Sequence, residues 1–136
     1  MSASERLGVM DLIAQAEREI QATSVEETMA QADQADYLIV DVRDVRERQR
    51  DGFIPQSFHC PRGMLEFWID PKSPYFKTEF EDKSRIVFHC AADWRAMLCT
   101  HIAQRMGNDN VAYMKGGLTQ WKERGGEVAF PPPKSK

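Results

Sequence analysis

The sequence is poor in cysteine and contains no long apolar run. Its three cysteines, Cys60, Cys90 and Cys99, include no CxxC pair, so we expect reduced thiols and no disulfide framework. No stretch approaches the roughly eighteen apolar residues that would cross a bilayer, and residues 1–20 lack the unbroken apolar region of a signal peptide. A membrane protein and a disulfide-stapled secreted protein are therefore excluded, and a cytoplasmic protein is expected.

The chain also lacks an excess of basic residues. Its 18 Lys and Arg residues are outnumbered by 21 Asp and Glu residues, which gives a formal net charge of -3. Nucleic-acid-binding proteins usually present a strongly basic face to the phosphates, so no polynucleotide partner is expected. A hydrophobic content of 42% over 136 residues is ordinary for a single globular domain with one core.

The three histidines do not form a metal-binding pattern. His59 and His89 each directly precede a cysteine, and neighbouring side chains on a strand point to opposite faces. No predicted helix offers two ligands one turn apart. We therefore expect structural histidines and no metal ion.

Apolar runs alternate with amphipathic segments along the chain. The runs predict strands at residues 20–22, 37–42, 57–60, 85–89 and 111–114. The amphipathic or capped segments predict helices at residues 9–18, 24–32, 45–50, 94–106 and 118–124. Strands separated by helices imply right-handed crossovers, and so an α/β fold with a parallel sheet covered on both faces.

The pattern divides the chain into three parts. Residues 1–19 are a helical extension that packs on the domain or on a partner, and residues 20–128 form the domain. Residues 129–136 are expected to be an extended tail, because three successive prolines cannot continue a helix. The connection at residues 61–84 is too apolar for a disordered linker, and we expect it to fold back over the domain as helix, turn and flap.

Cys90 is the candidate nucleophile. It directly follows the strand predicted at residues 85–89 and precedes the helix predicted at 94–106, and ligands of parallel sheets bind beyond the carboxyl ends of the strands. Backbone N–H groups at a helix N-terminus stabilise an anion such as a thiolate. The competing interpretation is a buried structural thiol, which we favour for Cys60 and Cys99.

The residues that follow Cys90 would shape its pocket. Arg95 adds a positive charge in the first helical turn, and the small side chains of Ala91 and Ala92 leave the backbone accessible. The negative charge of Asp93 would oppose an anionic substrate, and we expect this residue to cap the helix. The predicted substrate-binding residues are Ala91, Ala92, Asp93, Trp94, Arg95 and Ala96.

Three segments together resemble one family. The segment LIVDVRDVRERQRDGFIP resembles the early signature of rhodanese-like sulfurtransferases, and HCAADWRA occupies the place of their active-site loop. The segment NVAYMKGGLTQWKERGGEV resembles their closing signature. The three segments lie in the family's order and span nearly the whole of residues 20–128.

The resemblance implies a single rhodanese-like domain, a three-layer fold with a five-stranded parallel sheet flanked by helices. It implies that Cys90 takes a sulfane sulfur from a donor, holds it as a persulfide and passes it to a thiophilic acceptor, in a ping-pong mechanism without metal or organic cofactor. It also assigns Arg95 to closing the loop. Asp41 and Arg43 would hold the loop from beneath by polar contacts, the alternative being a surface ion pair of little energetic value.

Four residues of the connection, Arg62, Glu66, Phe67 and Trp68, would line the mouth of the pocket, with simple packing of the two aromatic residues as the competing interpretation. By resemblance, Asp93 and Ala96 stand where the family commonly has glycine and serine. Both changes disfavour a strongly anionic donor such as thiosulfate. We expect the partners to be small sulfur donors and thiol acceptors or a protein persulfide, with a homodimer as an option, and neither nucleic acid nor a membrane.

Two other functions stay open. One is a regulatory or non-catalytic rhodanese-like module that binds a partner through the N-terminal helix and residues 61–84. The other is a small oxyanion phosphatase or arsenate reductase. Phosphatases of related architecture have a wider loop between cysteine and arginine than the four residues that separate Cys90 from Arg95, so a loop fitted to a single sulfur atom is favoured.

Overall fold

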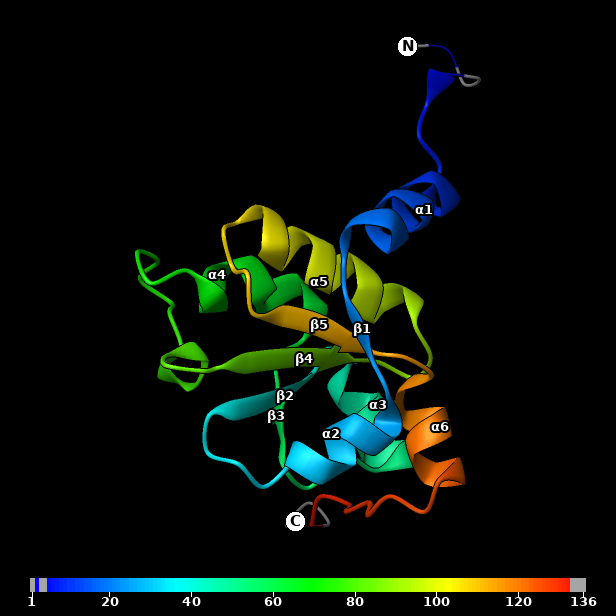
Figure 1. The fold of residues 1–136 in the computed structure, drawn as a ribbon, viewed down its shortest axis with the longest axis vertical. Helices are drawn as coiled ribbons and strands as arrows, with labels where there is room; N and C mark the ends of the chain where they lie inside the picture. Colours follow the sequence, from blue (N-terminus) through cyan, green and yellow to red (C-terminus); the bar gives the residue numbers. More distant parts are fainter. Residues whose placement is uncertain (1, 3–4, 133–136) are drawn as a thin grey trace.

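The computed structural model describes residues 2 and 5–132, and a parallel sheet forms its centre (Figure 1). The strands are β1 (Ala22–Thr23), β2 (Tyr37–Asp41), β3 (Ser57–His59), β4 (Arg85–His89) and β5 (Val111–Met114). Their order in the sheet is β1-β5-β4-β2-β3, and every neighbouring pair is parallel. The predicted α/β fold with a five-stranded parallel sheet is confirmed.

Helices cover both faces of the sheet. They are α1 (Val9–Glu19), α2 (Val25–Gln31), α3 (Val45–Asp51), α4 (Leu65–Ile69), α5 (Trp94–Arg105) and α6 (Gly117–Glu123). Figure 1 shows α1, α4 and α5 on one side of the sheet and α2, α3 and α6 on the other. The three expected layers are therefore present.

Each face of the sheet has its own apolar core. Val40 of β2 and Phe88 of β4 belong to the cluster under α1, α4 and α5, whereas Ile39 and Val87 belong to the cluster under α2 and α6. Successive side chains of a strand point to opposite faces, so a strand buried on both sides is apolar at every position. This double burial explains the continuous apolar runs that identified β2 and β4.

Most predicted elements agree with the observed ones to within one residue at each end. The exception is the strand predicted at residues 20–22, of which only Ala22 lies in β1. Ile20 caps α1, since its N–H donates to the carbonyl oxygen of Ala16 at 2.9 Å, and the strand can begin only after this turn. Helix α1 itself packs on α5 through the buried Ile13 and Ala16.

The connection at residues 61–84 contains the short helices η2 (Arg62–Met64), α4 and η3 (Thr78–Phe80). The segment folds back over the domain as expected, because Phe80 is buried and its ring packs edge-on against Phe58 of β3. At the other end of the chain, Ala129 forms an antiparallel bridge with Phe53, so the expected tail begins with a residue tied to the domain. Residues 1 and 3–4 of the predicted extension and 133–136 of the predicted tail lie outside the described residues.

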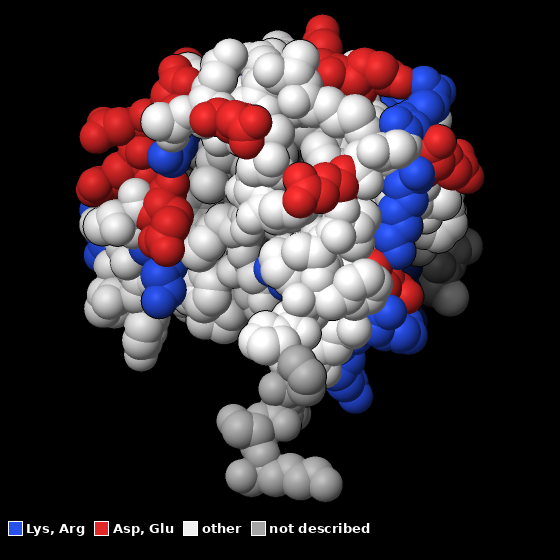
Figure 2. Space-filling model, turned by 90° about the horizontal axis from the view of Figure 1, so that it is seen from below, with Lys and Arg blue, Asp and Glu red and all other residues white. Residues whose placement is uncertain are grey.

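The surface shown in Figure 2 carries both acidic and basic side chains, and much of its centre is uncharged. Along the right edge of this view, Lys and Arg side chains form a row that lies beside Asp and Glu side chains. Within residues 5–132, no helix is long and apolar enough to cross a membrane.

Candidate active site

Cys90 directly follows β4 and begins the turn into α5, as predicted. Its residue is only 2% exposed, and it lies at the base of a cavity of about 420 Å³. The lining of this cavity is Cys90, Ala91, Ala92, Asp93, Trp94 and Arg95. Trp94 is 56% exposed at the same cavity, whereas Ala96, the last of the predicted binding residues, is fully buried and does not line it.

The carbonyl groups of the loop face α6. The N–H of Leu118 donates to the carbonyl oxygen of Cys90 at 2.9 Å, and the N–H of Thr119 donates to that of Ala91 at 3.1 Å. In contrast, no acceptor in the described part of the chain is hydrogen-bonded to the N–H groups of residues 91–96. A run of backbone N–H groups without partners at the start of a helix is a site where an anion is stabilised.

Gly117 allows α6 to approach the loop so closely. Its φ is +58°, and a Cβ atom there would lie 2.5 Å from the carbonyl oxygen of Ala92 and 2.6 Å from that of Cys90. Only glycine combines this left-handed backbone with such a close approach. The glycine pair in the closing sequence segment therefore sets the shape of the cysteine loop.

Asp93 has a different role from the one predicted. It occupies the N-cap position of α5, but its side chain makes no capping hydrogen bond. Instead, its Oδ1 accepts the N–H of Gly116 at 2.8 Å. The backbone of Asp93, with φ -133° and ψ -45°, departs from the extended conformation usual at an N-cap, and the carboxylate joins the loop to the turn before α6.

Arg95 lines the cavity, but its guanidinium is engaged elsewhere. Nη1 donates to Oε1 of Glu47 at 2.6 Å and Nη2 donates to Oε2 at 3.0 Å. These hydrogen bonds lower the pKa of Glu47, and the same bonds raise the pKa of Arg95. The positive charge expected beside Cys90 is thus largely neutralised by α3.

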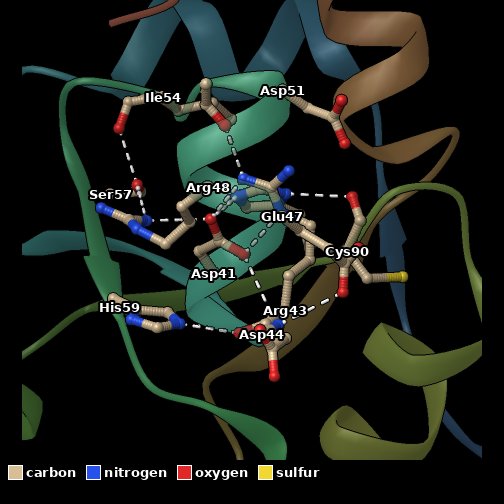
Figure 3. Close-up of polar contacts among 12 residues, drawn as sticks. Asp41, Arg43, Asp44, Glu47, Arg48, Asp51, Ile54, Ser57, His59 and Cys90 are labelled. Carbon is tan, nitrogen blue, oxygen red and sulfur yellow. Dashed lines mark hydrogen bonds and ion pairs between the residues drawn. The ribbon is translucent and has the colours of Figure 1, made fainter. Parts of the chain in front are cut away.

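A buried charged network lies beneath the loop (Figure 3). Arg43 donates from Nε to Oδ1 of Asp41 at 2.9 Å and from Nη2 to Oδ2 at 2.8 Å, and Arg48 donates from Nη1 to Oδ2 at 2.9 Å. Asp41 and Arg43 are fully buried, so the alternative of a surface ion pair is wrong. Burial alone would raise the pKa of Asp41, but the hydrogen bonds and charge of Arg43 hold it well below its usual range.

Hydrogen bonds to backbone carbonyl groups tie the end of β2 to the end of β4, and Arg43 to the end of α3. The N–H of Val42 donates to the carbonyl oxygen of His89 at 3.1 Å, and Nη2 of Arg43 donates to the carbonyl oxygen of Gly52 at 2.8 Å. In Figure 3 the sulfur atom of Cys90 points away from Asp41 and its two arginines. Asp41 and Arg43 therefore hold the end of β2 beside the loop, and neither touches the position where a substrate would sit.

His89 is the residue whose part in the site the sequence did not reveal. Its Nδ1 donates to the carbonyl oxygen of Cys90 at 3.2 Å, and its Nε2 lies 3.9 Å from Oδ2 of Asp41 without a hydrogen bond. Complete burial lowers the pKa of His89, although the charge of Asp41 opposes this shift. The ring is thus neutral, with its proton on Nδ1.

The remaining predicted residues lie apart from Cys90. Arg62 and Glu66 line a second cavity and not the one that contains Cys90. Cys60 and Cys99 are buried free thiols, and burial raises the pKa of each to about 12. In the described residues, no group of three or more His, Cys, Asp and Glu side chains is arranged to hold a metal ion.

The fold and the loop agree with comparisons to known proteins. The family model of the rhodanese-like domain matches residues 24–124. The chain belongs to the rhodanese-like family. Over 96 residues, which are 67% of this chain and 86% of the relative, it is 31% identical to a rhodanese domain-containing protein of Drosophila melanogaster.

Two solved structures extend the comparison of this rhodanese-like chain. One is a protein of unknown function from Rhodopseudomonas palustris, described as a possible tyrosine phosphatase. It is 40% identical and has a TM-score of 0.86, over 95% of this chain and 99% of that one. The other is a thiosulfate sulfurtransferase of Pseudomonas aeruginosa, 24% identical with a TM-score of 0.72, over 90% of this chain and 22% of that one. The second likeness shows the rhodanese-like fold alone.

Proposed function

We propose that the protein is a sulfurtransferase that carries sulfane sulfur as a persulfide on Cys90. The observation that carries this proposal is that residues 91–95, whose backbone N–H groups have no hydrogen-bond partner among the described residues, line a cavity together with Cys90. A persulfide formed on Cys90 would place its terminal, negatively charged sulfur in that cavity. The backbone N–H groups and the N-terminus of α5 would stabilise this charge.

The reaction has two nucleophilic steps. With thiosulfate as donor, the thiolate of Cys90 attacks the outer sulfur, the S–S bond of thiosulfate breaks, and sulfite leaves with the bonding electron pair. In the second step, cyanide or a thiolate attacks the terminal sulfur of the persulfide. The S–S bond to Cys90 then breaks and the thiolate of Cys90 is regenerated, so no external oxidant or reductant is needed.

Intact-mass measurement after treatment with thiosulfate tests the proposal. We expect a gain of one sulfur atom that cyanide removes, with thiocyanate as the product. The adduct should be absent in Cys90→Ser and present in Cys99→Ala, whose thiol is equally buried but lies outside the loop cavity. An unmodified wild-type protein with thiosulfate and with glutathione persulfide, or an adduct that survives Cys90→Ser, would overturn the proposal.

A phosphatase is the second candidate, because the Rhodopseudomonas palustris protein at 40% identity is described as a possible tyrosine phosphatase. Two features of this chain oppose it. Only four residues separate Cys90 from Arg95, and the guanidinium of Arg95 is held by Glu47, where it does not face a phosphate in the loop. Hydrolysis of para-nitrophenyl phosphate that is lost in Cys90→Ser would favour the phosphatase over the sulfurtransferase.

A further inference from the structure

A second and larger cavity lies on the same side of the sheet as α5. It has a volume of about 630 Å³ and is formed by α1, η2, α4 and α5. Its lining residues are Leu12, Gln15, Arg62, Gly63, Leu65, Glu66, Leu98, Cys99, His101, Ile102 and Arg105. None of these residues lines the Cys90 cavity, so the two cavities are separate.

The lining divides into an apolar floor and a charged rim. The buried Leu65 and the half-buried Leu98 and Ile102 supply hydrocarbon surface. At the exposed rim, the guanidinium groups of Arg62 and Arg105 make no hydrogen bond or ion pair with any described residue. Glu66, which is exposed, is the one acidic residue in the lining. The rim therefore carries more positive than negative charge.

His101 also lines the cavity, but its ring nitrogen lies against Glu19 of α1. Its residue is 9% exposed, and its Nε2 forms no hydrogen bond although it lies 3.3 Å from Oε2 of Glu19. Because this atom is buried against the carboxylate of Glu19, it is not one of the groups that a ligand in the cavity could reach. The cavity thus offers an apolar floor and two guanidinium groups that have no partner among the described residues.

We propose that this cavity is a binding site for an amphipathic acid, a molecule with an aromatic or hydrocarbon body and one anionic group. The volume falls within the range of small-molecule sites, roughly 300–1,000 Å³. The body packs on the floor, and the anionic group pairs with Arg62 and Arg105, whose planar guanidinium groups suit carboxylates, sulfonates and phosphates. The site is independent of the chemistry of Cys90, because no residue is shared.

Two fluorescent probes that differ only in charge test the proposal. Anilinonaphthalene sulfonate carries the anionic group, and phenylnaphthylamine has the same rings without it. We expect the wild-type protein to bind the sulfonate about tenfold more tightly than the neutral amine. Arg105→Gln should remove most of this preference. Glu66→Gln should increase it, because the carboxylate at the rim repels the sulfonate.

Controls separate this site from general attraction to the protein. Arg46→Gln removes an arginine of α3 that is 83% exposed and does not line the cavity, and it should leave both affinities unchanged. Amide chemical shifts in the presence of the sulfonate should move in residues 98–105 and not in residues 91–95. Equal affinity for the two probes, indifference to both Arg105→Gln and Glu66→Gln, or shifts centred on residues 91–95 would overturn the proposal.

Discussion

The guanidinium of Arg95 forms a bidentate pair with the carboxylate of Glu47, in which each terminal nitrogen donates a hydrogen bond to one carboxylate oxygen. The pair joins the first turn of α5 to the first turn of α3, across 48 residues of sequence. Glu47 also accepts the backbone N–H of Asp44, which completes the capping box of α3. A cation that the sequence places beside Cys90 is therefore held in a neutral pair.

Removing the carboxylate should unmask this cation. In Glu47→Gln, we expect the KM for thiosulfate to fall about three- to tenfold, because a full positive charge at the edge of the cavity attracts the dianion. Arg95→Gln should change KM less, since the charge that it removes is already compensated. Steady-state assays with thiosulfate and cyanide measure both effects, and Glu79→Gln, which removes an exposed carboxylate from η3, corrects for net charge. A KM in Glu47→Gln equal to that of Glu79→Gln would contradict this account.

Two substitutions of Asp93 distinguish the effect of its negative charge from the effect of its hydrogen bond to Gly116. Asp93→Asn keeps a side-chain oxygen that can accept the N–H of Gly116 but removes the negative charge at the cavity. We therefore expect kcat/KM for thiosulfate to rise by about three- to tenfold in Asp93→Asn. Asp93→Gly removes both the charge and the tie to the turn before α6, so its gain should be smaller. If the two variants behave alike, the hydrogen bond to Gly116 does not shape the loop.

The contact of Gly117 with the loop carbonyls predicts a large effect on catalysis. In Gly117→Ala, the added Cβ collides with the carbonyl oxygens of residues 90–92 and must displace the loop. A displacement of about 1 Å near a reacting group costs on the order of 100-fold in rate. Gly125→Ala is the matched control, because Gly125 also has a positive φ, +80°, but its Cβ would meet nothing within 4 Å. We expect both variants to lose stability and only Gly117→Ala to lose sulfur transfer; equal rates would exclude the steric role.

The sheet was the most predictable part of the molecule. Strands that are buried on both faces appear in the sequence as continuous apolar runs. Cys90 and Asp41 stand at the ends of two such runs, and both residues lie at the carboxyl ends of their strands. The apolar composition of residues 61–84 likewise indicated packing on the domain. The composition could not indicate which cavity the side chains of this segment line, because short helices of three to five residues have no usable periodicity. Arg62 and Glu66 were therefore assigned to the wrong cavity.

The polar contacts of the site were less predictable for a related reason. The partners of Arg95 and Asp93 are Glu47 and Gly116, which come from other elements, and no local spacing records such a pairing. His89 illustrates the same limit. Its position next to Cys90 was evident, but its burial and its approach to Asp41 depend on the pairing of β4 with β2. Propensity and periodicity describe which face of the chain is buried, and they do not describe which polar groups meet there.

The burial of His89 makes the stability of the fold depend on pH in a defined window. Because burial lowers the pKa of His89 in the folded state below its ordinary value of 6.5, the unfolded state binds a proton that the folded state does not. The contribution is fully present above about pH 6.5 and is lost as the pH falls below it. The carboxylates of Asp41 and Glu47 also have lowered pKa values, but their contributions are lost only below their ordinary values of 3.8 and 4.5. The interval between about pH 6.5 and pH 5 therefore separates the contribution of His89 from those of Asp41 and Glu47.

Urea unfolding across this interval should show the effect. We expect the free energy of unfolding of the wild-type protein to fall with decreasing pH, with a slope of up to about 1.4 kcal/mol per pH unit from His89. In His89→Gln the amide can still donate to the carbonyl oxygen of Cys90, but no group titrates there, so the slope should become flatter even if the variant is less stable at every pH. An unchanged slope would show that His89 is protonated to the same extent in the folded and unfolded states, and that the neutral ring beneath the cysteine loop is a wrong assignment.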